Sequence, residues 1–356
     1  MSKRPVQRKN ARNKGLTYKA AGVDIAAADS FVASVAQKAR ATFSPLVFEH
    51  ALGYSGLMRP ALDGVREPLI AATCDGVGTK LLLARAAARY EGLGQDLVAM
   101  SVNDLLPVGA RPLLFLDYIA AGKLDAKAMA TVIDGVVRSC REVGCTLLGG
   151  ETAEMPGLYA KGDFDLAGFA VGIADRTRLP RPETIQAGDR VLALASTGIH
   201  ANGLSLARRA LLGRGKMKLG ARPRGLGKTR VDELLTPTAL YVRPVLDLMQ
   251  KTTVKAAAHI TGGGLLTRTE KLVRGDLRLV IEPQSYRRPP IFDLIAAAGA
   301  VSATEMARTF NMGLGFVVVL DAEAATSVVA SGIDPWIMVG AVVPGRHGVD
   351  LGYARS

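Results

Sequence analysis

Short apolar runs alternate along the first half of the chain with segments whose apolar residues recur at helical spacing. Strands are predicted at residues 69–74, 112–120, 145–148 and 165–173, the first of them buried. Helices are predicted at about 27–39, 79–90, 94–105 and 125–143, and a loop at 41–66. Strands that alternate with helices are typical of α/β architecture, so we expect an α/β domain over residues 17–175.

A second α/β pattern follows a break marked by Pro180, Pro182 and Gly188. Strands are predicted at 190–195, 277–281, 317–320 and 336–343, and helices at 204–212, 237–251, 265 onward and 291–298. The fold class is therefore α/β (α+β type), with a second domain at 188–345. Gly227-Lys228-Thr229 imitates the end of a P-loop, but Arg222 stands where that motif needs glycine, so 213–229 is predicted to be a surface loop.

Composition fits a globular chain. Its 356 residues are 49% hydrophobic, which is enough for two cores. No apolar run approaches the roughly 18 to 20 residues of a membrane span, and the basic N-terminus is not followed by an apolar segment. A cytoplasmic location is expected.

Cysteine content and charge narrow the possibilities further. Cys74, Cys140 and Cys145 are odd in number and lack metal-ligand spacing, so they are expected to be buried, reduced thiols. The net charge of +13 suits an anionic ligand or nucleic acid. Six of the basic residues lie in the first fifteen positions, so residues 1–16 are expected to be a basic disordered tail. No aromatic residues are interleaved with these charges, which makes nucleic acid an unfavoured partner.

The clearest candidate chemistry lies where the first strand ends, at Asp75-Gly76-Val77-Gly78-Thr79-Lys80. Paired glycines let backbone N–H groups approach a phosphate, and the carboxylate and ammonium beside them suit a metal and a phosphate. A strand-to-helix turn with a solvated Asp and Lys is the alternative. Lys19 and Asp24 bracket Gly22 before the first helix, where they would reach a phosphate and a metal or simply cap the helix.

Eight blocks follow one another in order from about residue 17 to 345. They are Tyr18-Lys19 with Gly22-Val23-Asp24-Ile25, Asp75 to Lys80, Val102-Asn103-Asp104, Phe115-Leu116-Asp117-Tyr118, Gly149 to Gly157, Gly198 with His200 and Asn202-Gly203, His259 with Thr261 to Gly264, and Phe310-Asn311 with Gly313 and Gly315. In their order and residues these blocks resemble phosphoribosylformylglycinamidine cyclo-ligase, also called aminoimidazole ribonucleotide synthetase.

This resemblance implies a homodimer in which the N-terminal domains share a β-barrel-like interface. It also implies ATP-dependent closure of formylglycinamidine ribonucleotide to aminoimidazole ribonucleotide, with release of ADP and phosphate. An amide oxygen leaves poorly, which explains the need for ATP: phosphorylation of the formyl oxygen converts it into a good leaving group. Such a reaction needs positioning and charge stabilisation, with Mg²⁺ held by carboxylates and phosphates.

The same resemblance assigns roles to individual residues. Magnesium ligands are expected at Asp75, Asp104 and Glu151, and catalytic roles at Lys19, Asp75 and His200. Nucleotide contacts are expected at Asp24, Gly76, Gly78, Thr79, Lys80, Asn103, Asp117, Gly149, Gly150 and Thr152. Substrate contacts are expected at Thr197, His200, Asn202, Gly262, Gly263 and Gly264. Each of these residues also has a purely structural interpretation. The acids would be helix caps or turn residues, the lysines would be solvated surface residues, and His200 would be a hydrogen-bonded histidine at the entry of a helix. No general base is identified.

Three departures from the family's usual sequence stand out. Ala20 replaces an acid, Gly53-Tyr54-Ser55-Gly56-Leu57-Met58 replaces a Gly-rich loop with Phe, and Arg268-Thr269-Glu270-Lys271 replaces Asn-Ile-Pro-Arg.

Two other functions stay open. One is a sister ATP-dependent phosphotransferase such as selenophosphate synthetase, thiamin-monophosphate kinase or the formylglycinamidine synthetase subunit. The first of these would need Cys or selenocysteine within 50–58, which contains neither. The other is an inactive nucleotide-binding regulator that docks on RNA through its basic tail, although the main blocks retain their acids.

Overall fold

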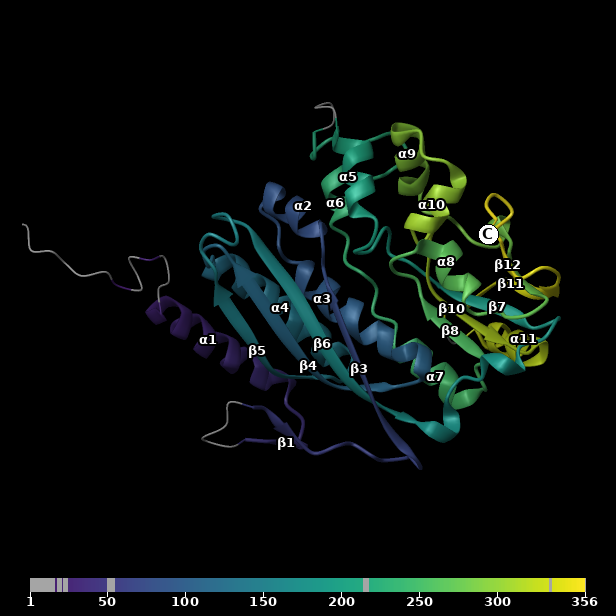
Figure 1. Cartoon of the computed structure of the whole chain (residues 1–356), viewed down its shortest axis with the longest axis horizontal. Helices are drawn as coiled ribbons and strands as arrows, with labels where there is room; N and C mark the ends of the chain where they lie inside the picture. The colour runs from purple at the N-terminus through teal and green to yellow at the C-terminus, as the bar shows by residue number, and fades with distance from the viewer. Residues whose placement is uncertain are drawn as a thin grey trace, which may run out of the picture.

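The computed structural model describes residues 17, 21, 25–49, 55–213, 218–332 and 335–355. The predicted tail, Lys19 and Asp24 lie outside the described residues, as do Ala20 and part of the 53–58 loop. The described chain forms two large sheets, which lie side by side with their helices in Figure 1, and a small two-stranded ribbon. An α/β fold with two such parts was predicted from the sequence, and it is confirmed.

The N-terminal part is a four-stranded sheet in the order β3-β6-β4-β5. Its strands are β3 (Pro68–Gly76), β6 (Phe164–Asp175), β4 (Arg111–Ala121) and β5 (Thr146–Glu154). Only the β4–β5 pair is parallel. Strand β5 continues through the Gly149-Gly150-Glu151 motif, which therefore lies in a strand instead of following one. A small ribbon, β1 (Val47–Phe48) with β2 (Leu57–Met58), precedes this sheet.

Helices cover one face of this sheet. Helices α3 (Leu93–Val102) and α4 (Ala126–Glu142) pack against each other and against strands of the sheet, and α1 (Ile25–Ala39) lies along β5 and α4 (Figure 1). Helix α4 begins at Asp125, whose Oδ1 accepts a hydrogen bond from the Ala128 N–H at 3.0 Å. Such an N-cap satisfies one of the free amides of the first turn. The short helix α2 (Lys80–Ala87) follows β3 directly.

No described helix covers the opposite face. Ile70 there is 79% exposed and Phe169 is 41% exposed, and Cys74 is exposed as well. The predictions that residues 69–74 form a buried strand and that Cys74 is buried are therefore wrong. These side chains are exposed because β3 is an edge strand and its outward side chains lie on the uncovered face of the sheet. Cys140 and Cys145 are buried free thiols, as predicted.

The C-terminal part is a six-stranded sheet in the order β12-β9-β11-β7-β10-β8, antiparallel except between β12 and β9. Its strands are β7 (Arg190–Ala195), β8 (Ala256–His259), β9 (Leu277–Ile281), β10 (Leu314–Leu320), β11 (Ile337–Pro344) and β12 (Gly348–Asp350). Its helices are α5 (Leu204–Leu212), α6 (Arg230–Leu234), α7 (Val242–Lys251), α8 (Gly264–Glu270), α9 (Pro290–Gly299), α10 (Ala303–Thr309) and α11 (Ala322–Ser331). Sequence reasoning missed β8, β12, α6, α10 and α11.

Two segments join the parts. The 3₁₀ helices η3 (Arg176–Arg178) and η4 (Pro182–Thr184) lie along the connection between β6 and β7. The 3₁₀ segment η2 (Asn103–Val108), which continues α3, packs against β8 of the C-terminal part. The buried apolar core runs through both parts.

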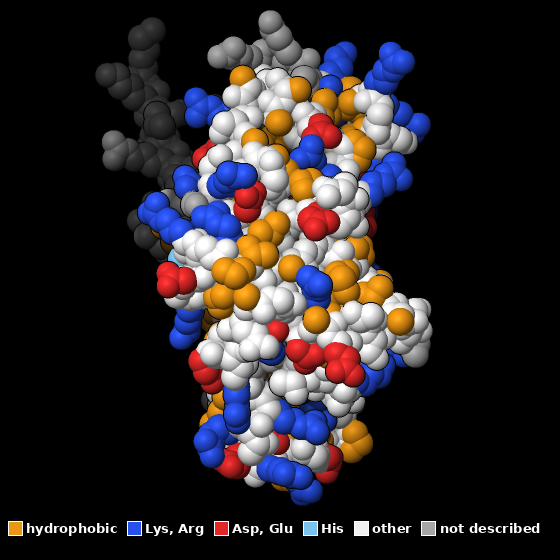
Figure 2. All heavy atoms as spheres, turned by 90° about the vertical axis from the view of Figure 1, so that its right-hand side faces the viewer, with side chains coloured by type: hydrophobic (Ala, Val, Ile, Leu, Met, Phe, Trp, Pro, Cys, Tyr) orange, Lys and Arg blue, Asp and Glu red, His pale blue; other side chains and the backbone are white. Residues whose placement is uncertain are grey.

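The surface fits a globular protein. Figure 2 views the end of the molecule formed by the C-terminal part, where basic and acidic side chains are interspersed with hydrophobic ones. Within the described residues, none of the helices is both long enough and apolar enough to cross a membrane.

Candidate functional site

Asp104 and His259 meet where the two parts pack together. Asp104 belongs to η2 and His259 is the last residue of β8, and their Oδ1 and Nδ1 atoms lie 2.8 Å apart. The other ring nitrogen, Nε2, lies 3.4 Å from the Asn103 amide nitrogen. Since a carboxylate only accepts and an amide nitrogen only donates, this pattern puts the proton of a neutral His259 on Nδ1. The His259 side chain is 1% exposed and that of Asp104 is 32% exposed, so the carboxylate alone reaches solvent.

Asn103 anchors this arrangement to the C-terminal part. Its amide donates to the Ala239 carbonyl at 2.9 Å and accepts from the Tyr241 N–H at 3.0 Å. The Asn103 side chain is buried and satisfied by the backbone, which leaves little freedom to the η2 segment carrying Asp104.

Asp75 interacts electrostatically with both members of this pair. It is half-buried near the end of β3, and its Oδ1 accepts from the Gly76 N–H at 2.7 Å. Burial raises the pKa of the Asp75 carboxyl, and the negative charge of Asp104 raises it further, whereas His259 and Arg268 act in the opposite direction. Asp75 and Asp104 therefore form a pair of carboxylates that repel each other, an arrangement that a divalent cation relieves.

The donor set fits magnesium. Within the described residues, no three acidic, His or Cys side chains converge as metal ligands. Mg²⁺ typically takes one or two protein carboxylates and completes its octahedron with phosphate oxygens and water. Asp75 and Asp104 supply that number.

A cavity of about 430 Å³ opens beside Asp104. Its walls come from η2, β8, α8 and the connection near Pro180, and they include His259, Arg268 and Lys271. Arg268 donates from Nε to the Gly262 carbonyl at 2.8 Å. The walls of the cavity thus carry the acidic Asp104 together with the basic Arg268 and Lys271. Such a lining suits an anion bound together with a cation.

Two glycine turns of the C-terminal part border the same region. A Cβ on Gly262 would lie 3.8 Å from Asn202 Oδ1, and Asn202 contacts the Met100 sulfur of α3 at 3.6 Å. Gly264 has φ +62° and lies so close to the Ala307 carbonyl that a Cβ would come within 2.3 Å of it. Glycine is thus required at 264 by backbone packing, whatever its role towards substrate.

His200 is buried beside these turns with φ +65°. Its Nε2 accepts from the Thr197 N–H at 3.2 Å, and its Nδ1 has no hydrogen-bond partner among the described residues. Burial lowers the pKa of His200 well below its usual value, and the charges of His259 and Lys80 add to the effect. The ring is therefore neutral at physiological pH, and the proton on Nδ1 is available to an acceptor.

Lys80 has an environment that the sequence did not indicate. Its ammonium is fully buried, 2.7 Å from Asp96 Oδ2 and 2.7 Å from the Thr236 carbonyl. Asp96 also accepts from the Thr238 N–H and hydroxyl through Oδ1, at 2.8 and 2.7 Å. Burial lowers the pKa of Lys80, and Asp96 opposes that shift. Lys80 thus ties α2 and α3 to the segment at 236–238, and its predicted phosphate contact stays a prediction.

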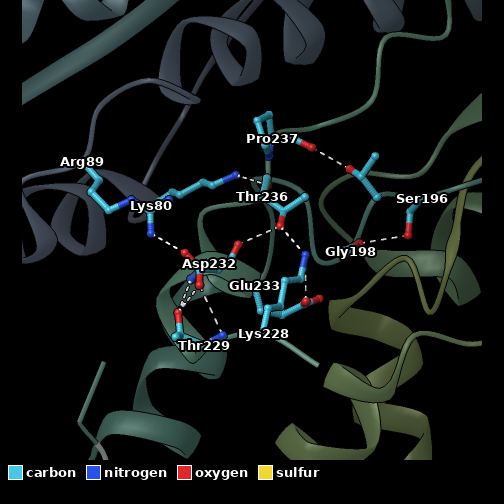
Figure 3. A network of polar contacts seen from close by, with 11 residues as sticks. Lys80, Arg89, Ser196, Gly198, Lys228, Thr229, Asp232, Glu233, Thr236 and Pro237 are labelled. Atoms are coloured by element: carbon cyan, nitrogen blue, oxygen red, sulfur yellow. Dashed lines mark hydrogen bonds and ion pairs between the residues drawn. The ribbon is translucent and has the colours of Figure 1, made fainter. Parts of the chain in front are cut away.

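Figure 3 shows the polar network around that segment. Lys228 donates to the Thr236 hydroxyl at 2.9 Å and pairs with Glu233 at 3.1 Å, while Arg89 pairs with Asp232 at 2.5 Å. Thr229 caps α6, so Gly227-Lys228-Thr229 belongs to a helix cap, in keeping with the rejection of a P-loop.

Two predicted site residues, Thr197 and Thr79, make hydroxyl contacts nearby. Thr197 donates its hydroxyl to the Pro237 carbonyl at 2.5 Å, and the Thr79 and Ser205 hydroxyls lie 3.0 Å apart across the two parts.

Asp117 and the Gly149–Thr152 motif line a different cavity, of about 460 Å³, between β5, α1 and the β1–β2 ribbon. The Asp117 side chain is buried, burial raises the pKa of its carboxyl to about 7, and Oδ1 has no hydrogen-bond partner among the described residues. A Cβ on Gly150 would come within 2.2 Å of that oxygen, so glycine at 150 keeps the carboxyl accessible from the cavity.

The sheet separates the two groups of predicted residues. Asp75 pairs in register with Gly168, Gly168 with Asp117, and Asp117 with Gly150. Three steps between strands amount to roughly 14 Å. Within one chain, Asp75 on β3 thus lies three strand steps from Gly149, Gly150, Glu151 and Thr152 on the edge strand β5, and Asp117 lies between them on β4.

Comparison with known proteins identifies the family. Residues 62–174 match the family "AIR synthase related protein, N-terminal domain", and residues 186–351 match its C-terminal domain. A phosphoribosylformylglycinamidine cyclo-ligase of Carboxydothermus hydrogenoformans is 45% identical over 340 residues, covering 94% of this chain and 98% of that protein. One of Myxococcus xanthus is 48% identical over 309 residues, covering 87% and 90%. The chain belongs to the phosphoribosylformylglycinamidine cyclo-ligase family. It is therefore an enzyme, as the sequence predicted.

Solved structures outside the cyclo-ligase family share the fold. Thiamine-monophosphate kinase from Stenotrophomonas maltophilia K279a has a TM-score of 0.66 at 17% identity, covering 92% of this chain and 97% of that one. Hydrogenase maturation protein HypE in complex with ATP has a TM-score of 0.65 at 16% identity, covering 94% of each chain. These two neighbours show that the fold is shared. Membership of the cyclo-ligase family supports nucleotide use.

Sequence reasoning passed over two residues of this site. His259 stands in a block that carries the resemblance to the cyclo-ligase family, and Arg268 in a segment that departs from it, yet neither was assigned a role. The available signal was a histidine three positions before a triple glycine. No local pattern indicated that this strand would pack on Asp104, because the two positions are 155 residues apart.

Proposed function

We propose that this enzyme converts formylglycinamidine ribonucleotide and ATP into aminoimidazole ribonucleotide, ADP and phosphate. The close similarity to proteins named phosphoribosylformylglycinamidine cyclo-ligase supports the reaction. The observation that carries the proposal is the 2.8 Å contact between Asp104 and His259, two residues of different parts whose charges both act on Asp75. A cytoplasmic location belongs to the proposal.

The chemistry follows from the leaving group. The formyl oxygen attacks the γ-phosphorus of ATP, the bond from that phosphorus to the ADP oxygen breaks, and ADP departs with the electron pair. The amine nitrogen then attacks the formyl carbon, the carbon–oxygen bond breaks, and phosphate leaves while the nitrogen releases its proton. Magnesium, held by Asp75 and Asp104, would neutralise phosphate charge.

The chain's own residues supply position and polarity. Asn202 and the turn at Gly262 would present amide and backbone groups to the substrate, and the Gly262 carbonyl accepts a hydrogen bond from Arg268, which lines the cavity beside Asp104. The neutral His200 holds a proton on Nδ1 and offers it as a hydrogen bond. Asn202 and His200 both lie where the two parts meet. A substrate bound by both parts would be shielded from water at its reacting groups.

The proposal includes a homodimer, formed through the uncovered face of the N-terminal sheet. Ile70 and Phe169 expose apolar surface there, and monomeric proteins rarely expose large apolar patches. Two such sheets placed face to face close into a barrel, in which the β3 edge of one chain meets the β5 edge of the other. That arrangement brings Glu151 of the partner subunit towards Asp75 and Asp104. It explains how residues roughly 14 Å apart in one chain would serve one nucleotide.

A product assay tests the reaction. The full-length protein with formylglycinamidine ribonucleotide, ATP and Mg²⁺ is expected to yield aminoimidazole ribonucleotide and one ADP per product. Omission of either substrate should stop ADP release. A folded protein that forms no aminoimidazole ribonucleotide under these conditions would refute the proposal.

A further inference from the structure

Arg268 is held in a defined position on the wall of the cavity beside Asp104. Its Nε donates to the Gly262 carbonyl at 2.8 Å, which fixes the guanidinium plane against the glycine turn. Nε occupies one edge of the guanidinium fork, so the two Nη groups remain for another ligand. Among the described residues, the structure records no hydrogen bond or ion pair to either of them.

The charges around Arg268 point to an anion. Asp104 and His259 line the same cavity as Arg268. No ion pair joins Arg268 to Asp104 within the described residues. A guanidinium and a carboxylate that share a cavity without pairing leave room for a ligand that binds to both. A phosphoryl group bound to a carboxylate-held cation is such a group.

We propose that Arg268 is a catalytic residue that binds the phosphoryl group as it moves from ATP to the formyl oxygen. The inference rests on the proposed function. As the bond to ADP breaks and the bond to the formyl oxygen forms, negative charge spreads over the three equatorial oxygens of the phosphoryl group. The Nη groups of Arg268 donate to these oxygens.

Arg268 suits this role better than Lys271, which lies on the same cavity wall. Lysine binds phosphate as a point charge and lacks the guanidinium fork.

The test compares Arg268→Gln and Arg268→Lys with Arg274→Gln. Arg274 is exposed and only six positions further on, and the control removes the same charge from the same region. Arg268→Gln is expected to lower kcat on the order of 100-fold, as removal of one charge-stabilising donor does. Its KM for formylglycinamidine ribonucleotide should change less than about twofold, because the bound ribose phosphate is not the group contacted. Arg268→Lys should fall between, and Arg274→Gln should match the unsubstituted protein.

Ligand binding provides a readout that is independent of turnover. Binding of ADP with aluminium fluoride and Mg²⁺, which mimics the transferring group, should weaken at least tenfold in Arg268→Gln, whereas binding of ADP alone should not. This arm still reports on Arg268 if no aminoimidazole ribonucleotide is formed. Unchanged kcat, unchanged fluoroaluminate binding, or a loss confined to the ribonucleotide KM would overturn the assignment, the last by placing Arg268 at the ribose phosphate.

Discussion

Asp104 and His259 lie 155 positions apart in the sequence, and a 2.8 Å hydrogen bond joins Asp104 Oδ1 to His259 Nδ1. One carboxylate oxygen is thereby fixed by the C-terminal part, and the carboxylate can present the other to a ligand. Hydrogen bonds to a ligating group orient it and tune its charge. The contact makes the proposed magnesium site depend on the packing of both parts.

Replacement of His259 tests this positioning. His259→Leu should lower the affinity for Mg²⁺ by about 10- to 100-fold, because Asp104 loses the donor that orients it. His259→Asn should recover most of the affinity, since its amide nitrogen lies near the position of Nδ1. The Mg²⁺ dependence of ADP formation measures both, and an unaltered dependence in His259→Leu would exclude the positioning role.

Asp75→Asn should abolish turnover while the protein stays folded. The substitution keeps the shape and removes the charge, so one of the two expected magnesium contacts is lost. The matched control is Asp63→Asn, an exposed aspartate in the loop before β3. Turnover is followed by product formation and folding by thermal unfolding. Turnover in Asp75→Asn at the rate of the control would remove Asp75 from the site.

Lys80→Met should destabilise the protein strongly. It leaves the Asp96 carboxylate buried without its cation, and a broken buried pair typically costs about 3–5 kcal/mol. Urea unfolding should show a lower midpoint with little change in the Michaelis constant for ATP. The opposite pattern, normal stability with weakened ATP binding, would support the phosphate contact that the sequence predicted.

Asp117 should make stability depend on pH. Its folded-state pKa of about 7 lies above the usual value near 3.9, so between these pH values the folded protein holds a proton that the unfolded chain has released. Its contribution to stability therefore falls as pH rises through this window. Asp117→Asn should gain about 2–3 kcal/mol relative to the unsubstituted protein between pH 5 and pH 8. Urea unfolding at both values measures the gain, and a difference that does not vary with pH would show that the carboxyl is not held neutral.

Local pattern predicted most elements because their signals are local. Strand β7 and helix α5 have the predicted bounds, at 190–195 and 204–212, and α4 begins at the Asp125 cap. Strand β8 was missed because four residues, three of them alanine, carry too little periodicity. The predicted start of α7 at Pro237 was five residues early, because residues 236–238 are held by Lys80 and Asp96 of the other part.

The site was less accessible to sequence reasoning because it depends on tertiary contacts. The sequence pattern of a lysine after paired glycines is the same whether its ammonium faces solvent or a buried aspartate. Only the packing of the folded chain shows that the Lys80 ammonium pairs with Asp96. Glu151 and Asp75 both stand in glycine-containing motifs and were both predicted to bind magnesium. The strand register separates them by three steps across the sheet, and neither segment by itself indicates this separation.

The proposed assembly of one site from two chains can be tested directly. Subunits carrying Asp75→Asn are unfolded and refolded together with subunits carrying Glu151→Gln, each inactive alone, in equal amounts. If each site takes Asp75 from one subunit and Glu151 from the other, every mixed dimer has one intact site, and about a quarter of the activity should return. A refolded mixture that contains mixed dimers but remains inactive would contradict the account.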